Sequence, residues 1–213
     1  MKSILVWVIS VLLVLTCLGT NPTIVAAQEQ TFLIANDIED DGDWVVNSEN
    51  HFFPDGAEGC KATAGSTTLG MANSFPDYGG KAFINFDFPL VPGEYAVTID
   101  VCNFDGPKND DGVSADLAHA DYIGLTVGGN KDNPGTLLTT AIETSSSKPR
   151  VAWGETKQWS FKYTFADNDP NLESKIGFLI DAPVKGEFLN MSFDNLKIMI
   201  DPAESYKSVG CSW

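Results

Sequence analysis

Residues 158–165 read QWSFKYTF, a run in which aromatic side chains alternate with polar or charged ones. Successive side chains of a β-strand point to opposite faces of its sheet, so the rings of this run fall on one face and Ser160, Lys162 and Thr164 on the other. One apolar face and one polar face are typical of a strand whose sheet covers a core on one side. The run therefore predicts a half-buried strand of an antiparallel sheet.

Similar short runs recur along the chain, and each is bounded by Gly, Pro, Asn or Asp. No segment has the apolar period of a helix of three turns. Many short strands with regular turn signals and no helices between them predict an all-β fold, an antiparallel two-sheet β-sandwich of the jelly-roll kind. The other expected strands are Ala82 to Phe88, Tyr95 to Val101, Tyr122 to Val127, Ile176 to Ile180 and Phe188 to Ile200.

The N-terminus has the pattern of an export signal. Lys2 precedes an almost unbroken apolar run from Ile4 to Leu18, and small residues follow up to Ala27. A short basic start, an apolar run and small residues at the cleavage point are what signal peptidase recognises. The apolar run is shorter than the roughly 20 residues that a membrane-spanning helix needs. We expect a signal peptide at 1–27, a β-sandwich domain at 28–200 and a C-terminal tail at 201–213.

Export implies a secreted or extracytoplasmic location, in a periplasm or at a cell surface. Two alternatives stay open: a retained N-terminal anchor, and a lipid anchor at Cys17, which ends the lipobox-like Leu15-Thr16-Cys17. No later segment is long and apolar enough to span a membrane, so we expect a soluble mature chain.

The composition is strongly acidic, with 29 Asp and Glu residues against 13 Lys and Arg and a formal net charge of −16. A phosphate backbone would repel such a chain, which excludes nucleic acid as a partner. Acidity of this degree is compatible with simple solubility and with the binding of divalent cations.

Three cysteines remain after removal of the signal: Cys60, Cys102 and Cys211. An odd number in an exported protein predicts one disulfide bond and one spare thiol. The pairings Cys60 with Cys211 and Cys60 with Cys102 are both open.

Three short motifs occur in a set order between residues 32 and 200. Asn36 to Glu39 followed by Trp44 resembles an opening Asp-Phe-Glu strand with its Trp, although Ile38 replaces the usual Phe. Trp159 opens a late strand, and 192–198 (SFDNLKI) resembles a closing Ile/Phe-Asp-Asn-Val-x-Leu strand. Together these motifs resemble carbohydrate-binding modules of the galactose-binding-like jelly-roll type. A sandwich of this shape hosts many functions, so the resemblance implies the fold more strongly than the ligand.

The resemblance also implies a structural calcium ion. In these modules an acidic residue of the opening strand and the Asp of the closing strand share the ion, and the matching residues here are Asp37 or Glu39, with Asp194. Hard oxygen ligands from two distant strands suit calcium. In the alternative interpretation Asp194 caps a turn and the other two carboxylates are solvated.

Sugar recognition requires exposed aromatic rings, which stack on pyranose rings, beside polar groups that bind hydroxyls. Trp153 follows Arg150 in a polar, Ser-rich segment, and this pair suits an acidic or sulfated glycan because a guanidinium binds anionic oxygens in a forked geometry. In the alternative, Trp153 packs on the sandwich edge. Trp44 and Trp159 are expected in the core. The expected ligand-binding residues are Phe75, Tyr78, Tyr122, Arg150 and Trp153.

Catalytic patterns are weak in this chain. The two histidines, His51 and His119, have no paired zinc spacing, and there is no Gly-x-Ser-x-Gly elbow. We therefore expect a secreted, non-catalytic carbohydrate-binding protein that attaches to a polysaccharide. The alternatives are a cell-surface or extracellular-matrix structural or adhesion protein without sugar binding, and a small polysaccharide hydrolase or lyase.

Overall fold

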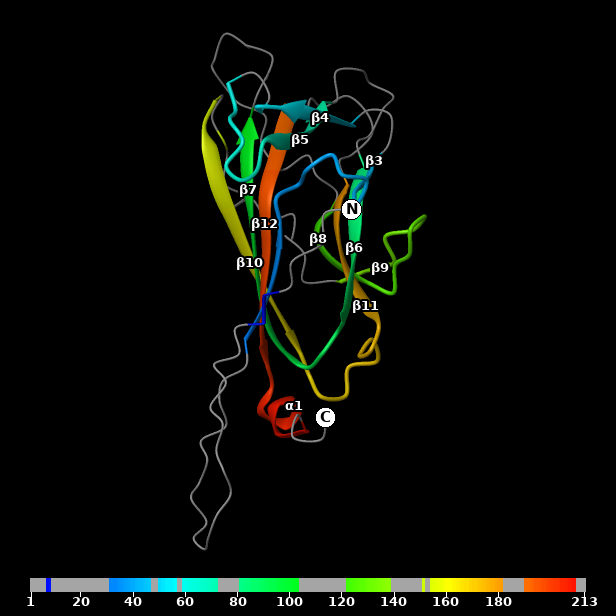
Figure 1. Cartoon of the computed structure of the whole chain (residues 1–213). Helices are drawn as coiled ribbons and strands as arrows, with labels where there is room; N and C mark the ends of the chain where they lie inside the picture. The colour runs from blue at the N-terminus through cyan, green and yellow to red at the C-terminus, as the bar shows by residue number, and fades with distance from the viewer. Residues whose placement is uncertain are drawn as a thin grey trace, which may run out of the picture.

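The protein is described by a computed structural model that covers residues 7–8, 31–46, 50–56, 59–72, 81–103, 122–138, 151, 154–181 and 190–209. Most of these residues lie in two antiparallel sheets, which pack against each other (Figure 1). The predicted all-β, two-sheet sandwich is confirmed.

The first sheet is built around its longest strand, β12 (Asn190–Pro202). One side of β12 pairs with β7, and the other side pairs with β5 and then with β2. β10 extends the sheet beyond β7, while β4 and β1 pair with β5 and β2. The other strands of this sheet are β1 (Trp7–Val8), β2 (Phe32–Asn36), β4 (Asn50–Pro54), β5 (Thr67–Ala72), β7 (Gly93–Asn103) and β10 (Thr156–Phe165).

The second sheet has five strands in the order β3, β6, β11, β8 and β9. These strands are β3 (Val45–Val46), β6 (Lys81–Pro89), β11 (Lys175–Asp181), β8 (Tyr122–Val127) and β9 (Thr136–Leu137).

The core between the sheets is formed by alternate residues of the strands, as the alternation in the sequence predicts. In β10, Trp159, Tyr163 and Phe165 are buried and Phe161 is partly buried, while the intervening residues are exposed. The expected positions of Trp159 and Trp44 in the core are confirmed, since each is 5% exposed.

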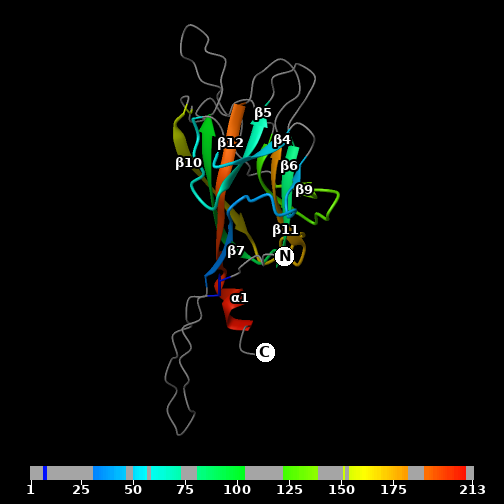
Figure 2. The same ribbon diagram turned by 45° about the horizontal axis from the view of Figure 1, so that its top comes forward.

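Strand termini from both sheets meet at one end of the sandwich, which we call the upper end (Figure 1). β5, β7 and β11 end there, and β6, β8, β10 and β12 begin there. At the opposite, lower end, the short connections 90–92 and 166–174 join the two sheets, and α1 follows β12 (Figure 2). The residue pairs that mark the upper end are Ala72 with Asn190, Cys102 with Thr156, Lys81 with Asp181, and Tyr122 with Asp181.

The C-terminal segment is more ordered than the sequence predicts. β12 continues to Pro202, and the six-residue helix α1 (Glu204–Val209) follows it. Its length, under two turns, explains why no helical period is visible in the sequence. None of the helices in the described part of the chain is long and apolar enough to cross a membrane.

Candidate functional site

Asp194 holds the segment that precedes β5. Its Oδ2 accepts hydrogen bonds from the backbone N–H groups of Thr63 (2.5 Å) and Ala64 (3.0 Å), and its Oδ1 accepts one from the N–H of Asn195 (2.7 Å). Asp194 is only 3% exposed. Burial raises the pKa of Asp194 above its ordinary value, although the hydrogen bonds oppose this shift.

Glu39 holds the next part of the same segment. Its carboxylate accepts hydrogen bonds from the backbone N–H groups of Ser66 and Thr67 and from both hydroxyls, at 3.1 Å from Ser66 and 2.8 Å from Thr67. Partial burial alone would raise the pKa of Glu39, but these hydrogen bonds outweigh it and lower the pKa below its ordinary value. Asp37 lies exposed nearby, with its Cβ close to Gly65.

Of the three expected calcium ligands, Glu39 and Asp194 thus bind one segment, and N–H and O–H donors already face their oxygens. A calcium ion takes about six to eight oxygen ligands. To reach both Glu39 and Asp194 it would have to displace the donors of 63–67. No three His, Cys, Asp or Glu side chains of the described residues lie close enough together to hold a metal ion. As placed, these residues do not fit a shared calcium ion, and the calcium expected from the resemblance stays a prediction.

Asp100 completes the arrangement, and sequence reasoning missed it. It lies opposite Asp194 across β7 and β12 and is 8% exposed. Its Oδ2 accepts hydrogen bonds from the hydroxyl of Thr63 (2.7 Å) and from Nδ2 of Asn195 (2.9 Å), and its Oδ1 accepts one from Nε2 of Gln158 (3.1 Å). The alternation along β7 places Asp100 on the polar face, but nothing in the sequence indicates that 60–66 covers it. We call Thr63, Asp100, Asp194 and Asn195 the carboxylate cluster.

A disulfide bond joins Cys60 to Cys102. This is one of the two pairings that the sequence left open; Cys211 lies outside the described residues. Both cysteines are 3% exposed, and Phe53 packs against them. The bond and the carboxylate cluster therefore fix the segment 60–67 to the first sheet, next to the upper end.

Four of the five expected ligand-binding residues lie outside the described part of the chain: Phe75, Tyr78, Arg150 and Trp153. Their described neighbours do have positions. The segment 73–80 joins the end of β5 to the start of β6, and both lie at the upper end.

The segment that carries Arg150 and Trp153 is also anchored at the upper end. Asn103, the last residue of β7, donates a hydrogen bond from Nδ2 to the carbonyl of Val151 (3.3 Å), and its own carbonyl accepts one from the N–H of Gly154 (2.8 Å). Phe75, Tyr78 and Trp153 therefore lie in sequence between described residues of the upper end, and Arg150 directly precedes one of these, Val151.

Tyr122, the fifth expected residue, begins β8 at the upper end but is 8% exposed. Its ring belongs to a buried cluster with Phe83 and Leu179. Its hydroxyl donates to the carbonyl of Leu125 and accepts from the N–H of Leu138 (3.0 Å). Burial raises the pKa of Tyr122. This corrects the expectation of an exposed loop ring, because the ring is buried and its hydroxyl bonds the backbone of Leu125 in β8 and of Leu138, which follows β9.

Five buried side-chain polar atoms have no hydrogen-bond partner within the described structure: Oγ1 of Thr68, Oδ1 of Asn85, Oδ1 of Asn103, Oγ1 of Thr126 and Nε1 of Trp159. Trp159 is 5% exposed and Asn103 is fully buried. Most buried polar groups in folded proteins are paired, so each exception needs an explanation.

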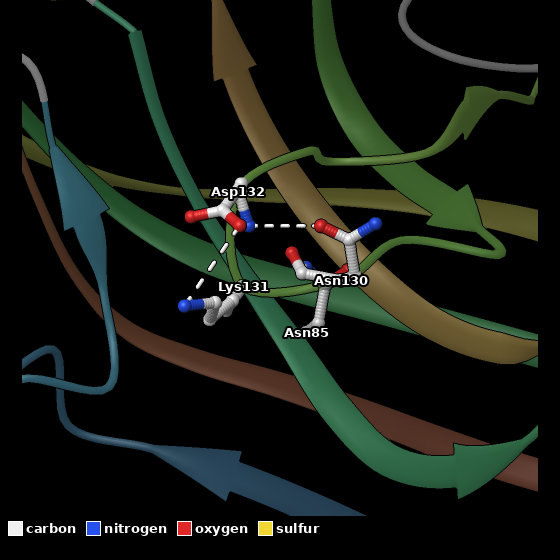
Figure 3. A network of polar contacts seen from close by, with 4 residues as sticks. All are labelled: Asn85, Asn130, Lys131 and Asp132. Carbon is white, nitrogen blue, oxygen red and sulfur yellow. Dashed lines mark hydrogen bonds and ion pairs between the residues drawn. The ribbon is translucent and has the colours of Figure 1, made fainter.

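A further polar network fixes the loop 128–135 on the second sheet (Figure 3). Asn85 donates from Nδ2 to the carbonyls of Asn130 (2.7 Å) and Asn133 (3.3 Å), and Oδ1 of Asn130 accepts from the N–H of Asp132 (2.9 Å). The ion pair of Lys131 and Asp132 is largely exposed, with 4.0 Å between Nζ and Oδ2, so it contributes little to the stability of the loop. Asn85 therefore sets the shape of this loop.

Comparison with known proteins gives likeness in structure alone. No protein-family model matches the chain, and no curated protein matches it in sequence. Among solved structures, a Stig cyclase, Fisc, from Fischerella sp. TAU matches with a TM-score of 0.51 and 16% identity, over 87% of this chain and 81% of that one.

Carbohydrate-binding modules are also among the matches. A family 35 module from Clostridium thermocellum has a TM-score of 0.45 and 14% identity, over 78% of this chain and 96% of that one. The CBM22-2 xylan-binding domain from Paenibacillus barcinonensis Xyn10C has a TM-score of 0.47 and 10% identity, over 78% and 98%. At these identities the likenesses concern the fold alone: the chain is an antiparallel two-sheet sandwich of the kind that the sequence predicts.

Proposed function

We propose that this protein is an exported, non-catalytic glycan-binding protein that contacts a polysaccharide with the upper end of its sandwich. The observation that carries the proposal is the strand register, because the segments bearing the predicted sugar contacts adjoin described residues at that end. Aromatic rings and a guanidinium at that end would supply the stacking and polar contacts that a glycan needs. The predicted contacts are Phe75, Tyr78, Arg150 and Trp153.

The anchoring of this end supports the proposal. Cys102 is covalently bound to Cys60, and the next residue, Asn103, holds Val151 and Gly154 on either side of Trp153. A binding loop is most effective when a rigid scaffold positions its base. Residues 151 and 154 give the Trp153 loop such a base.

An anionic glycan is the ligand class that we propose. The formal net charge of −16 repels an anionic polymer as a whole, so such a glycan would depend on a local cation, and Arg150, the single arginine of the chain, is the cation that we propose for this contact. A carboxylated or sulfated sugar would gain a charge-assisted hydrogen bond from it. Neutral glycans would lack this contact.

An extracytoplasmic location completes the proposal. The signal-like N-terminus motivates it, and the Cys60–Cys102 bond supports it, because disulfides persist mainly in oxidising compartments.

The test is a glycan array combined with pull-down on insoluble polysaccharides, each with calcium and with chelator. We expect binding to a carboxylated or sulfated polysaccharide, and loss of its preference over neutral polysaccharides in Arg150→Gln. Failure to bind any glycan under both conditions contradicts the proposal. Concentration-dependent assembly without glycan binding would favour a structural protein of the cell surface instead.

A further inference from the structure

The short strand β1 occupies an outer edge of the first sheet. Its two residues, Trp7 and Val8, pair antiparallel with Leu33 and Phe32 of β2. The other side of β2 pairs with β12. Both residues of β1 belong to the segment 1–27, which we expect to be removed on export. In the processed chain β2 therefore becomes an edge strand, whose N–H and C=O groups can pair with a further strand.

β2 lacks the features that protect an edge strand from such pairing. Its sequence, FLIAN, contains no charged residue and no proline, and its register with β12 is continuous. Charges, prolines, bulges and very short strands are the usual protection. The other edge strands of the described structure have it: β10 carries Lys157 and Lys162, β4 ends in Pro54, and β3 and β9 have two residues each.

Apolar side chains flank this edge on both faces of the sheet. On the outer face Leu33 lies opposite Met199, which is 52% exposed, the largest value among the exposed large hydrophobic residues described. On the inner face the partly buried ring of Phe32 packs edge-on against the partly buried ring of Phe88, with 5.5 Å between the ring centroids. Exposed apolar groups that gather in one place indicate a contact surface.

A second copy of the chain matches this edge. The pairing with β1 shows that the edge accepts an antiparallel strand, and a two-fold axis at Ile34 brings the β2 strands of two copies together in that orientation. Leu33 of one copy then lies opposite Ala35 of the other, and no like charges meet because β2 is uncharged. An uncharged edge matters in a chain with a formal net charge of −16, since two such chains repel each other.

We infer that the processed protein forms a symmetric dimer in which the β2 strands of two copies pair antiparallel and join the two first sheets into one. Assembly stops at two copies, because each chain has then used its β2 edge. The dimer is independent of glycan binding: β2 pairs with residues 196–200 of β12, whereas the proposed glycan contacts adjoin the upper end, where β12 begins.

Analytical ultracentrifugation of the processed chain tests the inference. The protein is recovered after export, its first residue is determined by sequencing, and it carries Cys211→Ser so that this thiol cannot link two copies. Between about 1 and 200 µM, a range in which small interfaces associate, we expect the mass to rise from one copy to two and no further. A chain that stays monomeric, or that assembles beyond two copies, contradicts the inference. So does a first residue before Trp7, because β1 then still occupies the edge.

A charge on β2 should prevent the pairing. Leu33→Lys should raise the dissociation constant of the dimer at least about tenfold, because the new lysine lies at the edge and faces Lys197 of the other copy across Ala35. Leu137→Lys is the matched control: it changes an exposed leucine of another edge strand, β9, and should leave the dissociation constant unchanged. Melting curves show whether each variant is folded. Equal dissociation constants for the parent chain and folded Leu33→Lys, or equal weakening by both variants, contradict the inference.

Hydrogen exchange gives a readout that requires no substitution in β2. Edge-facing amides of residues 32–36 should exchange more slowly at the upper end of the concentration range than at the lower end, and those of β9 should not change. Exchange in 32–36 that is independent of concentration contradicts the inference, whatever the variants show. A monomer that binds glycan overturns the inference and leaves the proposed function standing, and a dimer that binds no glycan overturns the proposed function alone.

Discussion

Asp100 and Asp194 face each other across β7 and β12, and the single hydroxyl of Thr63 lies within hydrogen-bond distance of both carboxylates, at 2.7 and 3.1 Å. A hydroxyl has one proton, so it donates to one carboxylate at a time. No described lysine forms an ion pair with either aspartate. Backbone N–H and side-chain amide groups therefore supply most of the hydrogen bonds to two buried carboxyl groups on the outer face of the first sheet.

This relationship predicts a pH dependence. Because the pKa of Asp194 is raised in the folded state, its contribution to stability is greatest below the unfolded pKa of about 3.9 and is lost as the pH rises through the folded pKa. Between pH 3.5 and 7, the melting temperature of the wild type should fall relative to that of Asp194→Asn as the pH rises.

Glu39→Gln is the control of opposite sign. The pKa of Glu39 is lowered in the folded state, so its contribution to stability is present above the unfolded pKa and is lost as the pH falls through the folded pKa. The melting temperature of the wild type should therefore rise relative to that of Glu39→Gln as the pH rises. Parallel melting curves for the wild type and Asp194→Asn at every pH would contradict the assignment.

The Cys60–Cys102 bond should be the main covalent contribution to stability. It closes a loop with a sequence separation of 42 residues. The chain-entropy estimate for such a loop is about 4 kcal/mol. Cys60→Ser should lower the free energy of unfolding by roughly that amount in denaturant titrations, while Cys211→Ser, the control, should change it by less than about 0.5 kcal/mol. Equal losses in the two variants would argue against this assignment.

Gly177 is required for packing within the second sheet. A Cβ at this position would lie 2.5 Å from Oδ1 of Asn85, 2.7 Å from Oγ1 of Thr126 and 2.8 Å from the carbonyl oxygen of Ile84. Gly177→Ala should therefore cost about 1–3 kcal/mol of unfolding free energy, or more, through overpacking. In Gly128→Ala the new Cβ meets open space, and only the positive φ of +70° adds a cost of about 1 kcal/mol. A smaller loss in Gly177→Ala than in Gly128→Ala would show that the sheet relaxes around the new methyl group.

Removal of calcium should leave the protein intact. Hydrogen-bond donors already satisfy Glu39 and Asp194, so we expect EDTA to leave the melting temperature unchanged. A fall that added calcium reverses, and that is absent in Glu39→Gln, would instead establish the ion that the sequence resemblance implies.

The sequence predicts the strands whose two faces differ. β6, β7, β8, β10, β11 and β12 all coincide with expected runs, because each alternates or is continuously apolar. The sequence does not predict β5, because Thr67–Ala72 has no β-branched or aromatic run and no clear alternation of apolar with polar residues. Its fit depends on a neighbouring strand: a Cβ at Gly70 would collide with the ring of Phe53 in β4. A contact between two strands of this kind leaves no pattern in the local sequence of either strand.

In the candidate site, too, the residues with a local sequence pattern could be predicted and those defined by a distant contact could not. Asp194 was found because it belongs to a recognisable closing strand, whereas Asp100 and Thr63 were missed because their contact links a strand to a segment without a periodic pattern. Tyr122 was correctly placed at the start of a strand but wrongly expected to be exposed, since the sequence does not show that its hydroxyl reaches Leu138.

The central claim is that glycan binds at the upper end, and one titration tests it most directly. Calorimetry should compare the wild type, Trp153→Ala and Tyr206→Ala with the anionic polysaccharide selected by pull-down. Tyr206 is a suitable control because it is an exposed aromatic residue in α1, at the lower end. We expect Trp153→Ala to weaken binding about tenfold, the loss of one contact residue worth more than 1 kcal/mol, and Tyr206→Ala to have no effect. Equal weakening by both variants, or no effect of Trp153→Ala, would contradict the claim.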